Sequence, residues 1–195
     1  MKRLVFFALG SWLCFVNVHS KAMAEGPPKT GESLPSITLP IPEVAAERQY
    51  LGLSETKTFK ISEIKSRVVI IEIFSMYCPY CQREAPVVNS LYRKIAANPL
   101  WKDHIKVIGI GAGNSPFEVD IFKKKYDIPF PLFPDMDFIV HKAFGDVRTP
   151  YFIAVQLEEN GVVRVIFSEL GGLGEVDAFL NLILKRAGIN QGVEK

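Results

Sequence analysis

The chain has 195 residues, of which 48% are hydrophobic and 23% are charged. This ordinary globular composition excludes a mostly disordered or low-complexity protein and predicts one domain with terminal extensions. Because 23 basic residues face 21 acidic ones, the formal charge is only +2, which excludes a dedicated nucleic-acid-binding protein.

The first 24 residues have the pattern of a secretory signal peptide. Lys2 and Arg3 form a basic start, and residues 4–18 are mostly apolar but too few for a comfortable membrane span. Residues 22–24 (Ala-Met-Ala) offer small side chains before a cleavage site. We therefore expect an exported, periplasmic protein that is cut before Glu25. The alternative is an uncleaved N-terminal membrane anchor.

The segments that follow the signal are expected to form an N-terminal extension before the main sheet. Residues 25–33 are polar and rich in Pro and Gly, so we predict a flexible lead-in there. Residues 34–187 hold the predicted domain. Its first elements are expected to be an extended edge strand over 35–42, a hairpin formed by 49–53 and 57–61, and a short helical turn over 62–65.

The rest of the domain alternates between strand and helix patterns. Val68–Phe74 is a nearly continuous apolar, β-branched run, which is typical of a strand buried on both faces. Further strands are predicted over 105–110, 130–133, 151–157 and 162–167. Helices are predicted over 78–97, 116–126, 138–144 and 175–187, followed by a polar tail over 188–195. This order predicts an α/β fold with a mixed central sheet flanked by helices.

Two cysteines remain after the signal, Cys78 and Cys81, in the spacing C-x-x-C. A disulfide between residues three apart closes a tiny loop and stabilises a fold little, so chemistry explains the pair better. Pro79 suits the first position of the helix. Backbone N–H groups and the helix dipole there would lower the pKa of the Cys78 thiol. Cys78 is then the nucleophile of thiol–disulfide exchange and Cys81 the resolving thiol.

Glu72 interrupts the apolar strand six residues before Cys78. Carboxylates are rarely buried without a reason. Desolvation would raise the pKa of Glu72, so this residue could exchange a proton with Cys81. The alternative is that Glu72 faces solvent at the strand end or pairs with a basic residue such as Arg67.

These elements, taken in order over residues 59–187, resemble the thioredoxin superfamily. The resemblance places the two redox cysteines of the family at Cys78 and Cys81. It also places the family's buried acid at Glu72, its helix-kinking proline at Pro86 and its cis-proline at Pro150. It implies a thiol–disulfide oxidoreductase.

The same resemblance implies a substrate-binding segment opposite the thiols. A cis peptide before Pro150 would turn the Thr149 backbone toward the Cys78 sulfur, where a substrate chain could pair as an added strand. The two tyrosines beside the cysteines would form an apolar rim, or else would be surface aromatics without a role. The expected substrate-binding residues are Thr149, Pro150, Tyr77, Pro79 and Tyr80.

Two features point to different branches of the superfamily. The N-terminal strand extension and the strand–helix insertion before the cis-proline resemble exported TlpA/ResA-type reductants. The stretch Ile71–Cys81 is closer to DsbA, a disulfide oxidant, and its Pro-Tyr dipeptide is familiar from glutaredoxins. The direction of electron flow therefore stays open, with TlpA/ResA-like exchange favoured, and we expect an intermediate reduction potential.

Other function classes explain the sequence less well. His104 and His141 lack metal-site spacing to the cysteines, so no metal is expected. A peroxiredoxin-like peroxidase would carry proline where Ile71 stands, and a non-redox chaperone or binding module would leave the cysteines unexplained. We expect no cofactor beyond the redox-active disulfide and no nucleic acid. The expected partners are exported cysteine-containing proteins and a membrane thiol donor or acceptor protein. We expect the protein itself to be a monomer.

Overall fold

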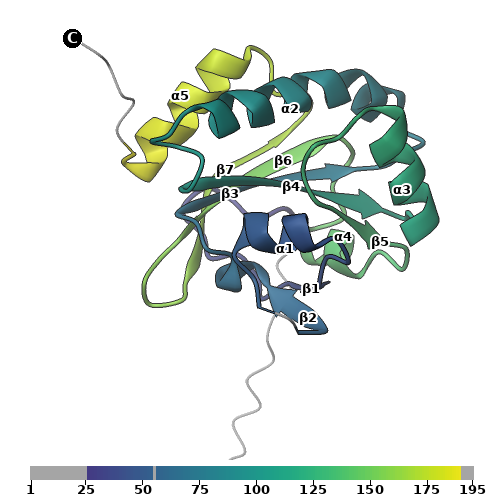
Figure 1. Ribbon diagram of the computed structural model, residues 1–195, viewed down its shortest axis with the longest axis horizontal. Helices are drawn as coiled ribbons and strands as arrows, with labels where there is room; N and C mark the ends of the chain where they lie inside the picture. The colour runs from purple at the N-terminus through teal and green to yellow at the C-terminus, as the bar shows by residue number, and fades with distance from the viewer. Residues whose placement is uncertain (1–25, 55, 190–195) are drawn as a thin grey trace, which may run out of the picture.

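The computed structural model describes residues 26–54 and 56–189, so the predicted signal peptide and most of the tail lie outside the described part. A central mixed sheet has helices on both faces (Figure 1), which confirms the predicted α/β class. Its strand order is β5-β4-β3-β6-β7. β4 runs parallel to β3 and to β5, whereas β6 is antiparallel to β3 and to β7. These strands are β3 (Val68–Phe74), β4 (Ile105–Ala112), β5 (Leu132–Asp135), β6 (Tyr151–Leu157) and β7 (Val163–Leu170).

The two faces of the sheet pack in separate layers, because successive side chains of a strand point to opposite faces. On one face, Ile70 and Phe74 of β3 pack in a cluster with side chains of three helices. On the other face, Ile71 and Ile73 pack with the N-terminal extension and a short helix, α4 (Ile139–Ala143). The three helices of the first layer are α2 (Pro79–Ala97), α3 (Pro116–Lys125) and α5 (Val176–Ala187).

The N-terminal extension is a small two-stranded sheet and one helix. β1 (Thr38–Pro40) pairs antiparallel with β2 (Thr58–Lys60), and α1 (Ala45–Leu51) lies between them in the chain. The hairpin predicted between 49–53 and 57–61 is therefore wrong, because residues 49–51 form the last turn of α1. Gly52 ends this helix in the left-handed conformation (φ 67°), which glycine adopts without a steric penalty.

Other boundaries differ less from the prediction. The helical turn predicted over 62–65 is a 3₁₀ turn at Ile61–Glu63. The predicted strand–helix insertion is present as β5 and α4, before the Thr149–Pro150 segment. No helix of the described residues is long and apolar enough to cross a membrane.

The lead-in predicted as flexible is bonded to the outer edge of the main sheet. The Gly31 N–H donates to the Val165 carbonyl (2.8 Å), and the Val165 N–H donates to the Glu32 carbonyl (2.9 Å). The Leu34 N–H donates to the Val163 carbonyl (2.7 Å). Because β7 is an edge strand, these bonds satisfy backbone groups that would otherwise be open to another chain.

Candidate active site

The amino end of α2 positions the two cysteines. Cys78 is the residue before the helix and has an extended backbone, and Pro79 is the first helical residue, where no N–H donor is needed. The Gln82 N–H donates to the Cys78 carbonyl (3.1 Å), which is the first bond of the helix. Both cysteines are free thiols; Cys78 is partly exposed, whereas Cys81 is completely buried. An incoming sulfur can therefore reach Cys78 first.

The two thiols differ in acidity as well as in exposure. Partial burial raises the pKa of the Cys78 thiol, but hydrogen bonds to the Thr149 side chain and to the backbone at Cys81 and Tyr80 outweigh it, so its pKa lies below the ordinary value. The pKa of Cys81 is raised well above its ordinary value, chiefly by burial, with contributions from Cys78 and from the charge of Glu72. At neutral pH, Cys78 is the thiol that ionises more readily.

Glu72 lies on the same side of the sheet as Cys81. Its side chain points to the same face of β3 as those of Ile70 and Phe74, which pack in the α2 layer, and it is only 3% exposed. Within the described residues its Oε1 atom has no hydrogen-bond partner. Burial raises the pKa of Glu72 to about 8, and the negative charges of Glu84 and Cys78 add to that rise. The alternative of a solvent-facing carboxylate is wrong, because Glu72 is buried. The Arg67 pairing is also wrong: among the described residues Arg67 forms no ion pair with Glu72, and its guanidinium donates to the Ala187 carbonyl (3.2 Å).

The Thr149–Pro150 segment lies against the nucleophile. Its peptide bond is cis, and the Cys78 Sγ atom is 3.3 Å from the Thr149 carbonyl oxygen. A groove of about 400 Å³ opens beside this segment, and an extended chain could lie in it. The groove is lined by Tyr80, Arg83, Glu84, Arg148, Thr149, Pro150, Leu170, Gly171 and Gly172.

Two tyrosines stand at the rim of the site. Tyr77 is 65% exposed and Tyr80 is 66% exposed, so both are open to a partner. The Tyr77 hydroxyl donates to the carboxylate of Glu118 at the start of α3. The Arg83 guanidinium lies 4.4 Å from the Tyr80 ring centroid and covers part of that ring. The substrate contacts expected of both tyrosines and of the exposed Pro79 stay predictions.

Sequence reasoning missed two side chains that hold the loop before Cys78. Asn114 follows β4 and is completely buried, and its Oδ1 accepts a hydrogen bond from the Met76 N–H (2.8 Å). Gln82 donates from its side-chain amide to the Met76 carbonyl (2.8 Å). Because both backbone polar groups of Met76 are held in this way, the path of the chain into Cys78 is fixed as well.

Glu84 is a second acid that the sequence analysis overlooked. It lines the groove, and its carboxylate accepts a hydrogen bond from the Leu173 N–H (2.7 Å). Its spacing could have revealed it, because residues three apart on a helix share a face, and Glu84 is three residues past Cys81.

Comparisons with known proteins agree with this geometry. A model of the AhpC/TSA family matches residues 30–167. The chain is 27% identical over 136 residues to the thiol-disulfide oxidoreductase ResA of Halalkalibacterium halodurans, which covers 68% of this chain and 72% of that protein. It is also 27% identical over 116 residues to ResA of Bacillus thuringiensis subsp. konkukian, which covers 59% of this chain and 63% of the relative.

Solved structures share the fold. A thiol:disulfide interchange protein from Bacteroides sp. superimposes with a TM-score of 0.59 at 16% identity, covering 86% of this chain and 94% of that one. StoA from Bacillus subtilis gives a TM-score of 0.51 at 19% identity, covering 65% of this chain and 88% of StoA. These matches confirm the predicted thioredoxin fold.

Proposed function

The chain belongs to the AhpC/TSA family and is an oxidoreductase of the thioredoxin fold, and we propose on this premise that it exchanges disulfides with exported proteins through Cys78 and Cys81. The observation that carries the proposal is the contrast between the two sulfurs. Cys78 is reachable and has a lowered pKa, whereas Cys81 is buried and has a raised pKa. The likeness to proteins named thiol-disulfide oxidoreductase ResA supports thiol–disulfide exchange. The reducing direction and the periplasmic location are part of the proposal and rest on the TlpA/ResA-like features and the signal-peptide pattern of the sequence.

The first chemical step forms a mixed disulfide. The Cys78 thiolate attacks one sulfur of a substrate disulfide, a new S–S bond forms to Cys78, and the substrate S–S bond breaks. The second substrate sulfur leaves as a thiolate and takes a proton from solvent. A substrate strand held in the groove beside Pro150 would place its disulfide next to the Cys78 sulfur.

The second step releases the substrate. Cys81 gives its proton to the Glu72 carboxylate and attacks the Cys78 sulfur, so the mixed disulfide breaks and the remaining substrate sulfur leaves as a thiolate. Two electrons have then passed to the substrate, and the chain holds a Cys78–Cys81 disulfide. A thiol-donor protein at the membrane must reduce that disulfide before the next cycle. Run in reverse, the same steps oxidise a substrate dithiol.

Trapping of the intermediate tests this function. The variant Cys81→Ala should accumulate mixed disulfides with exported proteins, visible as high-mass bands on a non-reducing gel that vanish when dithiothreitol is added. The double variant Cys78→Ala/Cys81→Ala is the control and should give no such bands. If Cys81→Ala also gives none, the proposed exchange is wrong.

Two measurements together test the direction of electron flow: the reduction potential, obtained by equilibration with glutathione, and the redox state of the cysteine pair in cells. We expect a reduction potential between the values of about −270 mV for thioredoxin and about −120 mV for DsbA. A cysteine pair that alkylates as dithiol in cells supports the reductase. A pair found as a disulfide in cells would assign the protein to the oxidant direction instead.

A further inference from the structure

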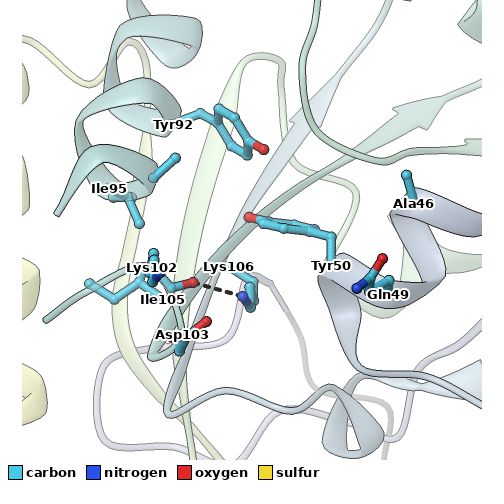
Figure 2. A pocket seen from close by; sticks show the side chains of 10 residues that line it. Ala46, Gln49, Tyr50, Tyr92, Ile95, Lys102, Asp103, Ile105 and Lys106 are labelled. Atoms are coloured by element: carbon cyan, nitrogen blue, oxygen red, sulfur yellow. Dashed lines mark hydrogen bonds between the residues drawn. The ribbon is translucent and has the colours of Figure 1, made fainter. Parts of the chain in front are cut away.

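A second pocket lies at the other end of α2, away from the thiols. It has a volume of about 420 Å³ and opens between α1, the last turns of α2 and the start of β4 (Figure 2). Tyr92, its first residue from α2, is eleven positions past Cys81, or about 16 Å along the helix axis. The pocket is lined by Ala46, Gln49, Tyr50, Tyr92, Ile95, Ala96, Lys102, Asp103, Ile105 and Lys106.

Lys106 brings an incompletely compensated charge into this pocket. The residue is only 7% exposed, yet among the residues of ranges 26–54 and 56–189 its ammonium group donates to one carbonyl, that of Lys102 (2.7 Å), and it lies 4.7 Å from the Tyr50 ring centroid. An ammonium has three N–H donors. Within the described residues, no carboxylate lies close enough to form an ion pair with it. Burial lowers the pKa of Lys106, which the charge of Lys102 lowers further and that of Asp103 opposes.

Two tyrosine hydroxyls add donors to the same space. The Tyr50 hydroxyl accepts a hydrogen bond from the Val107 N–H (2.8 Å), so its own proton is left to donate. Burial raises the pKa of Tyr50 and of Tyr92, so both phenols keep their protons at neutral pH. The two rings approach from different helices, with centroids 5.7 Å apart (Figure 2). In the described part of the chain, the Tyr92 hydroxyl has no hydrogen-bond partner.

We propose that this pocket is a binding site for a small carboxylate with an apolar body. The two ammonium groups of Lys102 and Lys106 outnumber the single carboxylate of Asp103, so the lining favours an anion. A carboxylate accepts from both an ammonium and phenolic O–H groups. The apolar side chains of Ile95 and Ile105 give the rest of such a molecule a surface to pack on. The inference does not depend on the redox function.

Benzoate and its neutral analogue benzamide are suitable probes, because they share a shape and differ in charge. We expect benzoate to bind the purified chain with a Kd of about 1 mM and to shift the NMR amide signals around Tyr50 and Lys106. Benzamide should bind at least about tenfold more weakly. Equal binding of the two probes, shifts confined to another part of the chain, or no binding at 20 mM benzoate would overturn the proposal.

Variants assign the binding to the named donors. Lys106→Met should weaken benzoate binding by about tenfold or more, and Lys142→Met, at an exposed lysine of α4, is the matched control that should not. Because Lys106→Met could also disturb folding, Tyr92→Phe is the second variant. It removes one oxygen, keeps the ring contacts and should weaken binding about threefold. The proposed site would be contradicted if Tyr92→Phe bound benzoate as tightly as the wild type does and the wild type bound benzamide as tightly as benzoate.

Discussion

Neighbouring residues of β3 differ in role because they face different layers of the protein. Ile71 is buried among the side chains of the N-terminal extension and α4, in a layer built from apolar contacts. Glu72, the next residue, is almost as deeply buried, but it lies on the face covered by α2, where Cys81 is. The pleat of β3 therefore separates two layers: a structural layer around Ile71, and a chemical layer that holds Glu72 and Cys81. The buried carboxylate of Glu72 lies in the layer where the Cys81 thiol must lose a proton.

The largest effect should come from the nucleophile. Cys78→Ser should lower the rate of insulin reduction at least about 1,000-fold, because a hydroxyl does not ionise near neutral pH and cannot replace the thiolate. Its urea unfolding should match that of the wild type, because Cys78 is partly exposed and the substitution changes one atom. Residual activity above about one tenth of the wild-type rate would show that another group carries the exchange.

A substitution in the structural layer should lower stability and leave the reactivity of Cys78 unchanged. Ile71→Ala should reduce the free energy of unfolding by about 3 kcal/mol, because it leaves a cavity in a fully buried cluster. The rate at which iodoacetamide alkylates Cys78 in the folded protein should change less than twofold. Ile70→Ala, the matched change in the α2 layer, should cost a similar amount. An altered Cys78 alkylation rate in Ile71→Ala would show that the two layers are coupled.

Glu72 should make stability depend on pH with a definite sign. Its pKa rises from the ordinary 4.5 to about 8 in the folded state, so its stabilising contribution is complete below pH 4.5 and is lost as the pH rises through 8. Relative to Glu72→Gln, the wild type should therefore lose about 4 kcal/mol of unfolding free energy between pH 5 and pH 9. Urea titrations of both proteins across this range measure the difference. Parallel curves would mean that Glu72 is not buried as described.

The same variant should separate the two chemical steps. Glu72→Gln cannot accept the proton of Cys81, so resolution of the mixed disulfide should slow by about 10- to 100-fold. Attack by Cys78 should be nearly unchanged, because the groups that lower the pKa of that thiol are at Thr149, Cys81 and Tyr80 and do not include Glu72. Stopped-flow measurements with a disulfide peptide resolve both phases. Equal slowing of the two phases would remove the special role of Glu72.

The sequence predicted the features whose signals are local and missed those made by distant partners. An acid within a seven-residue apolar strand and a C-x-x-C pair at a helix start are visible in short windows. Asn114 and Glu84 gain their roles from Met76 and Leu173, which are 38 and 89 residues away in the chain. The helix α1 was missed for a related reason: its seven residues are too few for a clear helical period, and Leu51 is its one buried residue, so no apolar stripe marks it in the sequence.

The smallest expected effect concerns Glu84, which lines the groove and whose negative charge raises the pKa of the buried Glu72. Glu84→Gln keeps an oxygen for the Leu173 N–H but removes the negative charge that raises the pKa of Glu72. The pKa of Glu72, followed by NMR of its carboxyl carbon, should therefore fall by less than about 1 unit. Glu84→Ala should lower this pKa to a similar extent and also cost about 1 kcal/mol of stability through the lost hydrogen bond. If Glu84→Gln leaves the titration of Glu72 where it was, the charge of Glu84 does not reach the buried acid, and burial alone sets its pKa.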